Sequence, residues 1–440
     1  MTDRPGKETK EQSWWRRPSL VVPWGVALVN LGVRLPRLSK PPVLVFDEVF
    51  YVPDASDLLR WGIEQGQPKH PPLGKWMIAA GIRFFGYTPF GWRIVAVLAG
   101  CAIAALVASA GLRLTGRWEL GALAGMLVGL DGIMFVMSRT GMLDIFVGLF
   151  VVVAAWCACS AWMVQPDHRK VRWYGVGAAV AIGVGGGVKW SAFYCLPVLA
   201  AAFVILDVRL APDRGRRVRE LVATAATWLV VPAVCYAAVF LPTFLTNSDQ
   251  LSPASFIDHQ RSLLNFHAGL QPKNPYAQSA ATWVFQTEPA ALFRQGCKPS
   301  QAGHSVTCPH RSLPTEIRIL VVANPVVWAA SILAGLGLLG VAVWKRAVFP
   351  ALLVALGLSQ FVPWLFTRPP YSFYETALVP LMVLWIPLAL LAVPRRPARL
   401  VAGAVGVAAL AMFLYLYPLW TAVPLSRSAY ADRQLVSTWP

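Results

Sequence analysis

Long apolar runs alternate with short polar connections along most of the chain, a pattern typical of helices that cross a membrane. A span needs about 20 mostly apolar residues, and this criterion selects eleven candidate helices. They lie at 20–34, 91–112, 119–137, 142–164, 173–188, 190–206, 221–243, 318–343, 348–366, 373–393 and 399–420. The first is short and a glycine-rich run at 183–187 separates the fifth from the sixth, so ten or twelve spans remain possible. We predict an all-α integral membrane protein.

Composition and charge support this class. Hydrophobic residues make up 56% of the 440 residues and charged residues only 14%, against about 25% charged in an ordinary globular protein. The net charge of +18 would suggest nucleic acid as a partner of a soluble protein. Here about half of the 39 Lys and Arg residues lie in short connections, as the positive-inside rule requires. We therefore expect membrane lipid rather than nucleic acid as a partner, a cytoplasmic N-terminus and, with eleven spans, an external C-terminus.

The predicted organisation has four parts. A cytoplasmic tail at 1–18 precedes a first transmembrane block at 19–244, which contains a long external loop at 35–90. A second external loop at 245–317 precedes a C-terminal transmembrane block at 318–440. Connections this long are commonly functional. In the first loop, 54–64 and 75–85 have apolar residues at helical spacing, which predicts two short helices at the membrane surface.

Two cysteines lie in the second loop, outside the predicted membrane region. We interpret Cys297 and Cys308 as a disulfide, because disulfides persist outside the cytoplasm. Two free thiols are the alternative. The sequence has no Cys/His cluster at zinc-ligand spacing, so we expect no structural metal site.

The strongest chemical candidate is the adjacent pair Asp47 and Glu48, just after the first predicted span. Such carboxylates can act as a general base, accept hydrogen bonds from sugar hydroxyls or bind a cation. An ordinary solvated loop with two acids is the alternative. The next candidate is His70-Pro-Pro-Leu-Gly-Lys75, whose prolines fix an extended start to a helix. Its alternative is a rigid helix start with a snorkelling lysine.

Further polar residues lie near the external ends of other spans. Arg139 needs an anion, either Asp144 of the same chain or a ligand phosphate. Lys189 follows the glycine-rich run. Imidazole and aromatic side chains, together with another cation, mark the second loop and the start of the tenth span: His259, His267, Asn274, Tyr276, Trp283, Arg368 and Tyr374. Aromatic belts at membrane interfaces are the alternative explanation for the aromatic members.

These candidates come from separate segments but converge on one face of the membrane. An acidic pair, several cations and aromatic residues at a lipid boundary suit an acceptor that must lose a proton and a donor that carries phosphate on a lipid. The pattern therefore indicates glycosyl transfer from a polyprenyl-phosphate sugar.

The chain resembles the protein O-mannosyltransferases, a branch of the multispanning GT-C glycosyltransferases (glycosyltransferase family 39), over nearly its full length. The resemblance rests on these blocks: Phe46-Asp47-Glu48, His70 to Lys75, Ser138-Arg139, Leu143-Asp144, Val188-Lys189-Trp190, Asn274-Pro275-Tyr276 with Trp283, and Arg368 with Phe373-Tyr374. It implies a GT-C fold and inverting transfer of mannose from polyprenyl-phosphate mannose to Ser or Thr of secreted proteins. The Sec translocon is then a possible partner.

The resemblance also implies residue roles. Asp47 is the expected base, and Glu48 is expected to hold the sugar or the acceptor. Arg139 is expected to neutralise the departing phosphate, with Lys189 and Arg368 as further phosphate ligands. The segment from His70 to Lys75 is expected to shape the place where the donor binds, and Asp144, His259, His267, Asn274, Tyr276, Trp283 and Tyr374 are expected to support the site or bind the acceptor.

Two departures from the family pattern stand out. The second loop has no room for the β-trefoil domain of eukaryotic members, which indicates a bacterial, actinobacterial-type form in the cell membrane with an extracytoplasmic site. Glu375 and the sequence Ala281-Thr282-Trp283, in place of a double Trp, leave the acceptor contacts of this loop open.

Two other functions remain as alternatives. A GT-C enzyme that moves a lipid-linked sugar onto a glycolipid or a cell-wall polysaccharide would also carry an acid in the first loop, although the His-Pro-Pro-Leu-Gly-Lys block argues against it. A transporter for a lipid-linked sugar would place ionisable residues near the midplane, whereas these cluster at one face. Because Asp47 and Glu48 lack a third carboxylate nearby in the sequence, they make a poor octahedral site, and we expect no metal or other cofactor.

Overall fold

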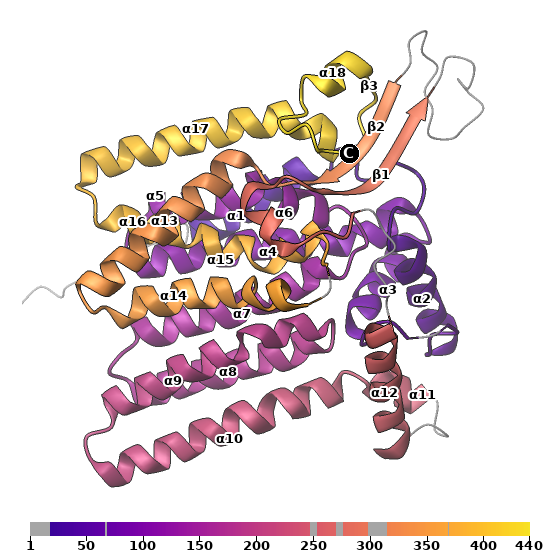
Figure 1. Cartoon of the computed structure of the whole chain (residues 1–440). Coiled ribbons are helices and arrows are strands. Elements are labelled where there is room, and N and C mark those ends of the chain that lie inside the picture. The colour runs from indigo at the N-terminus through magenta and orange to yellow at the C-terminus, as the bar shows by residue number, and fades with distance from the viewer. Residues whose placement is uncertain (1–17, 67, 247–252, 270–275, 298–314, 368) are drawn as a thin grey trace, which may run out of the picture.

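The computed structural model describes residues 18–440 apart from 67, 247–252, 270–275, 298–314 and 368. Helices packed side by side form a long bundle, and a small sheet and several crosswise helices gather at one end of it (Figure 1). The bundle helices are α1 (Pro18–Arg34), α4 (Pro89–Thr115), α5 (Trp118–Leu130), α7 (Asp144–Met163), α8 (His168–Gly186), α9 (Leu196–Leu210), α10 (Arg214–Ala238), α13 (Pro325–Trp344), α14 (Val348–Ser359) and α17 (Arg395–Trp420).

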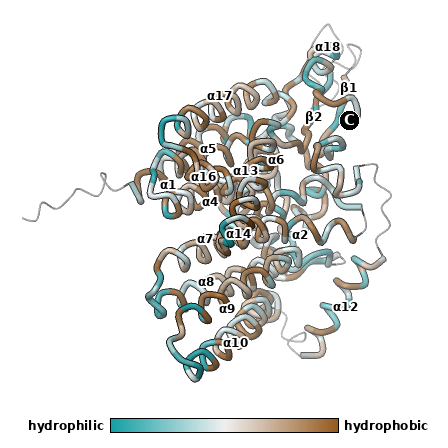
Figure 2. Tube along the Cα trace, turned by 60° about the vertical axis from the view of Figure 1, so that its left-hand side comes forward, coloured by the Kyte–Doolittle hydropathy of each residue, from teal (hydrophilic) through white to brown (hydrophobic). Residues whose placement is uncertain are grey.

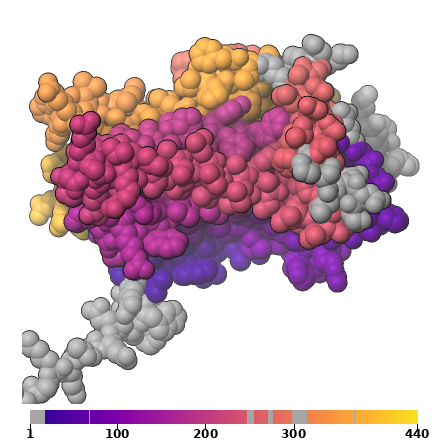
Figure 3. All heavy atoms as spheres, turned by 90° about the horizontal axis from the view of Figure 1, so that it is seen from below, coloured from indigo at the N-terminus to yellow at the C-terminus, as the bar shows by residue number. Residues whose placement is uncertain are grey.

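Short elements connect these helices near the crosswise end. They are α6 (Gly132–Met137), the 3₁₀ helices η2 (Trp190–Cys195), η4 (Ala280–Phe285), η6 (Val362–Phe366) and η7 (Ser372–Ala377), and the helices α15 (Val379–Val383) and α16 (Trp385–Leu391). Figure 2 shows hydrophobic residues along the body of the bundle and hydrophilic ones gathered at the turns. Seen from below, α10 extends along the bundle (Figure 3).

Six helical segments among the described residues are long and apolar enough to cross a membrane by length and composition. They are Pro89–Thr115, Asp144–Met163, Trp190–Leu210, Arg214–Thr246, Pro325–Trp344 and Arg395–Trp420. Pro18–Arg34, Trp118–Leu130, Val348–Ser359 and Val379–Leu391 are shorter apolar helices. The prediction of a largely helical, multi-pass membrane protein is therefore confirmed.

Local signals explain where the helices begin and how closely they pack. The hydroxyl of Thr88 accepts a hydrogen bond from Gly91 N at 3.1 Å and caps α4, with Pro89 in the first turn. Between α4 and α5, a Cβ at Gly125 would lie 2.6 Å from Ala104 O. The small residue thus lets the two backbones approach, as is common where helices pack in lipid.

The first long loop, at 35–90, folds into two helices, as predicted. They are α2 (Glu48–Trp61) and α3 (Leu73–Phe85), which pack on one another, and α3 also packs on α4. The ammonium of Lys75 on α3 pairs with Asp54 of α2 at 3.6 Å and with Glu64, which ties the two helices together. The short helix α11 (Leu241–Thr246), which leads into the second loop, and α12 (Pro253–Gly269) of that loop lie beside this pair (Figure 1).

The all-α prediction is wrong in one region. The described residues include three antiparallel strands, β1 (Ala290–Cys297), β2 (Thr315–Val321) and β3 (Leu425–Ser426), in the order β1-β2-β3. The helix predicted at 318–343 therefore begins as a strand, and α13 starts only at Pro325. A short run rich in Thr, Ile and Val favours a strand, but an apolar run of this length is ambiguous by periodicity alone.

The second loop and the C-terminal residues meet at the crosswise end of the bundle. Cys297 at the end of β1 is disulfide-bonded, while Cys308, its predicted partner, lies outside the described residues. After α18 (Arg427–Ala431), the buried indole of Trp439 donates to Gln286 O at 2.9 Å. The end of the chain thus packs against the loop that follows η4.

We expect Gly81→Ala to destabilise the protein, because the new Cβ would lie 2.2 Å from Gly91 O and push α3 away from α4. Overpacking of this kind costs about 1–3 kcal/mol. Thermal unfolding of the detergent-purified protein would show a lower midpoint. The matched control is Gly403→Ala, where nothing lies within 4 Å of the added Cβ. Equal midpoints for the two variants would contradict the close packing.

Candidate active site

A strained backbone turn at Phe46 immediately precedes the acidic pair Asp47 and Glu48. Phe46 has a φ of 46°, a left-handed conformation that costs about 1–3 kcal/mol in a residue other than glycine. Its ring is held by edge contacts to Tyr371 and Phe373, both with centroids 5.5 Å away. The backbone then enters α2, and the next two side chains, Asp47 and Glu48, have different surroundings.

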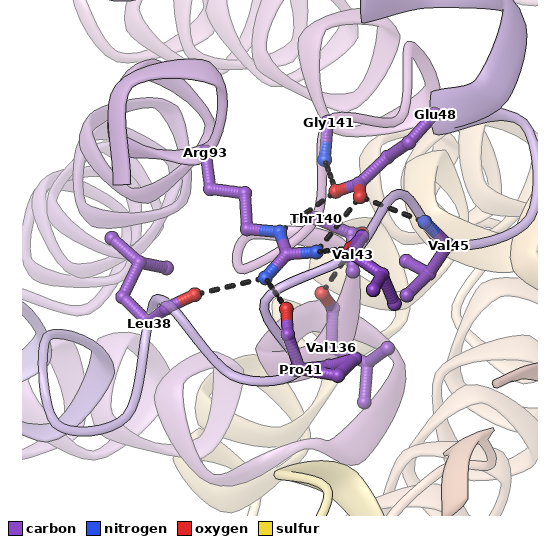
Figure 4. Close-up of polar contacts among 9 residues, drawn as sticks. All are labelled: Leu38, Pro41, Val43, Val45, Glu48, Arg93, Val136, Thr140 and Gly141. Atoms are coloured by element: carbon purple, nitrogen blue, oxygen red, sulfur yellow. Dashed lines mark hydrogen bonds and ion pairs between the residues drawn. The ribbon is translucent and has the colours of Figure 1, made fainter. Parts of the chain in front are cut away.

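The carboxylate of Glu48 is completely enclosed by the protein. Its Oε1 accepts from Arg93 Nε at 2.8 Å and from Gly141 N at 2.7 Å, while Oε2 accepts from Arg93 Nη2 at 2.8 Å and from Val45 N at 3.0 Å (Figure 4). Neither Glu48 nor Arg93 has an exposed side chain. Both oxygens are therefore occupied by internal donors.

Arg93 extends the same network to the first loop. Its Nη1 donates to Leu38 O at 3.1 Å and to Pro41 O at 3.0 Å, and its Nη2 donates to Val43 O at 2.9 Å (Figure 4). The sequence predicts that Glu48 holds the sugar or the acceptor, but this geometry does not fit that role. Glu48 and Arg93 instead bind the start of the first loop to α4.

Asp47 is half-buried and faces a different set of groups. Its Oδ2 accepts from the hydroxyl of Tyr51 at 3.2 Å, and its carboxylate makes no capping bond to α2. Burial raises the pKa of Asp47 to about 6, although the charge of Lys189 and the hydrogen bond from Tyr51 act in the opposite direction. A carboxylate with this pKa is a usable general base near neutral pH.

Lys189 and Asp144 form a buried ion pair beside Asp47. Lys189 Nζ lies 2.9 Å from Asp144 Oδ1 and 4.2 Å from the centre of the Tyr374 ring. Asp144 is one of the two anions considered for Arg139, but in the structure Lys189 takes that carboxylate. Residues from α2, α7, the start of η2 and η7 meet here, although they are far apart in the sequence.

A cavity of about 390 Å³ lies next to this cluster. Its polar and aromatic lining residues are His70, Lys189, Trp190, Ser191, Tyr194, His267, Trp364, Thr367 and Tyr374. The rings of Trp364 and Tyr374 stack with centroids 4.5 Å apart, and Tyr194 packs on Trp364 at 5.3 Å. The site thus has a cationic wall and an aromatic wall, which suits a ligand that carries both phosphate and apolar groups.

Two histidines, one from each of the two long loops, meet at this cavity. The rings of His70 and His267 are 4.9 Å apart, and His267 Nε2 lies 2.8 Å from Lys69 O. The ring of His70 also lies 6.0 Å from that of Tyr51. The second loop, through α12, therefore closes one side of the cavity that the first loop and η2 begin.

Several predicted site residues lie elsewhere. Lys75 is buried and paired with Asp54 and Glu64, so its charge is neutralised by protein groups and does not suit a donor ligand. Arg139 donates to Arg34 O and lies 5.1 Å from the centre of the Phe135 ring. Both contacts of Arg139 are with residues of α1 and α6. They do not support the expected position of Arg139 beside the departing phosphate.

The remaining candidates either pack against other side chains of the protein or lie outside the described residues. His259 packs on Phe240 with ring centroids 5.4 Å apart, and the buried Trp283 packs on Phe361 at 5.9 Å. Tyr276 is half-buried, and Asn274 and Arg368 lie outside the described residues. Glu375 accepts from Gln286 Nε2 at 2.7 Å inside the protein. None of these contacts includes Asp47 or Lys189.

Sequence reasoning missed Tyr51, Tyr194 and Trp364. Tyr51 could have been found, because a residue four positions after Asp47 lies above it on a helix. Tyr194 and Trp364 carry no local signal that separates them from membrane-interface aromatics. Across the described parts of the chain, no group of three or more His, Cys, Asp or Glu residues is placed to hold a metal ion.

Comparisons with known proteins give a consistent result. A family model described as dolichyl-phosphate-mannose-protein mannosyltransferase matches residues 88–248. The polyprenol-phosphate-mannose–protein mannosyltransferase of Mycolicibacterium smegmatis is 28% identical, with 97% of this chain and 93% of the relative covered. The protein of the same name from Corynebacterium glutamicum is 28% identical, with 82% of this chain and 80% of the relative covered.

Solved structures show the same fold. The S. cerevisiae protein O-mannosyltransferase Pmt1-Pmt2 complex bound to the sugar donor has a TM-score of 0.80 at 11% identity, with 97% of this chain and 93% of that chain covered. ArnT from Cupriavidus metallidurans has a TM-score of 0.57 at 18% identity, with 90% of this chain and 64% of that chain covered. At these identities the likeness establishes the GT-C fold alone.

We expect Glu48→Gln to lower stability, because it leaves Arg93 as a buried charge without its anion. Breaking a buried pair in this way costs about 3–5 kcal/mol. The measurement is the thermal unfolding midpoint in detergent, with Asp47→Asn as the matched control at the next position. Since Asp47 makes no such pair, its variant should unfold like the wild type. A Glu48→Gln midpoint equal to that of Asp47→Asn would refute a structural role.

Proposed function

We propose that the chain is a protein mannosyltransferase, which transfers mannose from polyprenyl-phosphate mannose to Ser or Thr hydroxyls of secreted polypeptides. One observation carries the assignment of the site. Asp47 has a pKa raised to about 6 by burial and lies with the Lys189–Asp144 pair beside a cavity of about 390 Å³. A base, a cation and a cavity with an aromatic wall therefore occur together.

The proposed reaction is a single displacement. The acceptor oxygen attacks the anomeric carbon of mannose, and Asp47 takes the proton of the acceptor hydroxyl. The bond between the anomeric carbon and the phosphate oxygen breaks, and polyprenyl phosphate leaves with the electron pair. Because attack and departure occur on opposite faces of the sugar, the anomeric configuration inverts.

Lys189 is the cation that we assign to the donor phosphate. Its ammonium is buried, oriented by Asp144 at 2.9 Å and part of the cavity wall. A cation fixed in place before the reaction stabilises the charge that develops on the leaving group. His70 lines the same cavity and stays in the proposal as a donor contact, whereas Lys75 and Arg139 are committed to other contacts.

The hydrogen bonds that the two carboxylates accept explain why Asp47, rather than Glu48, suits the role of base. Glu48 is held by Arg93 and two backbone amides, so both of its oxygens already accept hydrogen bonds from the protein and neither is open to an acceptor hydroxyl. Asp47 accepts one hydrogen bond, from Tyr51. Its other oxygen has no described protein donor and remains available to the acceptor hydroxyl.

We place the N-terminus in the cytoplasm, eleven spans in the cell membrane and the site on the extracytoplasmic face. The basic turns between α9 and α10, α13 and α14, and α16 and α17 lie at the end of the bundle opposite α2, α3 and the small sheet (Figure 1). The positive-inside rule supports a cytoplasmic position for these turns. An acceptor emerging from the Sec translocon would then meet the site.

We also propose that transfer needs no metal ion, because Lys189 supplies the positive charge at the donor. Chelation with EDTA should leave the initial rate of mannose transfer unchanged, and added Mn²⁺ or Mg²⁺ should not raise it. A rate that falls on chelation and returns with either cation would show that a metal takes part. Heat-treated enzyme supplies the background.

Mannose transfer from synthetic polyprenyl-phosphate mannose to a Ser/Thr-rich peptide tests the function. Asp47→Asn should lower the rate by about 10²–10⁴-fold, the usual contribution of a positioned base. Asp213→Asn is the matched control, because Asp213 caps α10 at the opposite end of the bundle and Asn can cap equally well. Transfer to a glycolipid but not to the peptide would favour the alternative GT-C function.

A further inference from the structure

We infer that Tyr51 is a positioning residue for Asp47: its hydroxyl holds one carboxylate oxygen so that the other faces the acceptor. The inference rests on the proposed function, since it assigns a role in the same transfer. Tyr51 does not line the cavity. Its proposed role is therefore to set the orientation and the pKa of the Asp47 carboxylate, not to contact the substrate.

The helix geometry brings the two groups together. Tyr51 follows Asp47 by four residues, so the two side chains lie on the same face at the start of α2. The hydroxyl is 3.2 Å from Asp47 Oδ2, and only 3% of the tyrosine is exposed. A buried phenol this close to a carboxylate acts as the hydrogen-bond donor.

Asp47 depends on this contact for its orientation. Aspartate at the first position of a helix commonly bonds to the backbone amides of the first turn, but Asp47 makes no capping bond. Within the described parts of the chain, Tyr51 is the hydrogen-bond donor to its carboxylate. Loss of the hydroxyl would therefore free the Asp47 side chain to rotate.

Other titratable groups also face this pair and set its electrostatics. Lys189, Asp144 and Lys69 act on Asp47, while Asp144 and Tyr374 also act on Tyr51. The ring of His70 lies beside that of Tyr51. Burial raises the pKa of Tyr51 well above its ordinary value, with the Asp47 charge acting in the same direction. Tyr51 thus stays protonated and remains a donor while Asp47 titrates.

The bond has a definite consequence for the pH profile. It favours the ionised form of Asp47 and so lowers a pKa that burial raises. Without the hydroxyl, Asp47 holds its proton to higher pH. The rise of kcat/KM with pH, expected near pH 6 in the wild type from the Asp47 pKa of about 6, then moves to higher pH.

Tyr51→Phe in the full-length membrane enzyme tests this role. We expect kcat at neutral pH to fall by about tenfold, the acid limb to move to higher pH, and the KM for the lipid donor to change by less than about threefold. Tyr87→Phe is the matched control, because it makes the same chemical change at a residue that is 51% exposed. The control should keep the wild-type profile.

Two results would overturn the inference. An acid limb at the wild-type pH in Tyr51→Phe, or a loss that is the same at every pH, would assign the residue to packing alone. Replacement of Tyr51 by 3-fluorotyrosine removes no atom needed for packing and makes the phenol a stronger donor, so it should move the limb to lower pH. No shift there would also refute the role. Absence of peptide mannosylation in the wild type would instead reject the proposed function.

Discussion

The buried ion pair between Glu48 and Arg93 is the constraint on which the rest of the site depends. It joins the start of α2 to the first turns of α4, and the remaining donors of Arg93 hold three carbonyl groups of the preceding loop (Figure 4). Because the charges are fully desolvated, either partner alone would be costly to bury. The pair therefore fixes the backbone at Asp47, whose own side chain is left for chemistry.

Lys189 and Asp144 form a second buried ion pair, but this pair positions a charge beside the cavity and does not only stabilise the fold. Its ammonium also lies on the wall of the cavity, so the bond to Asp144 orients a charge that remains available to a ligand. Asp47 adds a carboxylate nearby in a poorly solvated position. Burial raises the pKa of Asp47, and the charge of Lys189 limits that rise, so the carboxylate suits a base near neutral pH.

Several segments that are distant from one another in the sequence complete the cavity. The first loop supplies His70, α12 of the second loop supplies His267, and η2, η6 and η7 supply the aromatic wall. Lys75 has a supporting role in this arrangement, because its pairs with Asp54 and Glu64 hold α2 on α3. Lys75, which the sequence suggests as a ligand-binding cation, thus stabilises the pair of helices that carries Asp47.

The sequence by itself determined the membrane class, most of the long helices and the blocks that contain the site candidates, because hydrophobic length, caps and basic turns are local properties. It also selected Asp47, Lys189 and His70 as candidates. Only the tertiary structure decided that Glu48 is buried against Arg93, that Lys189 rather than Arg139 pairs with Asp144, and that residues 315–321 form a strand. Each of these depends on partners distant in the sequence, since burial and pairing, rather than residue type, decide whether a charge supports the fold or meets a ligand.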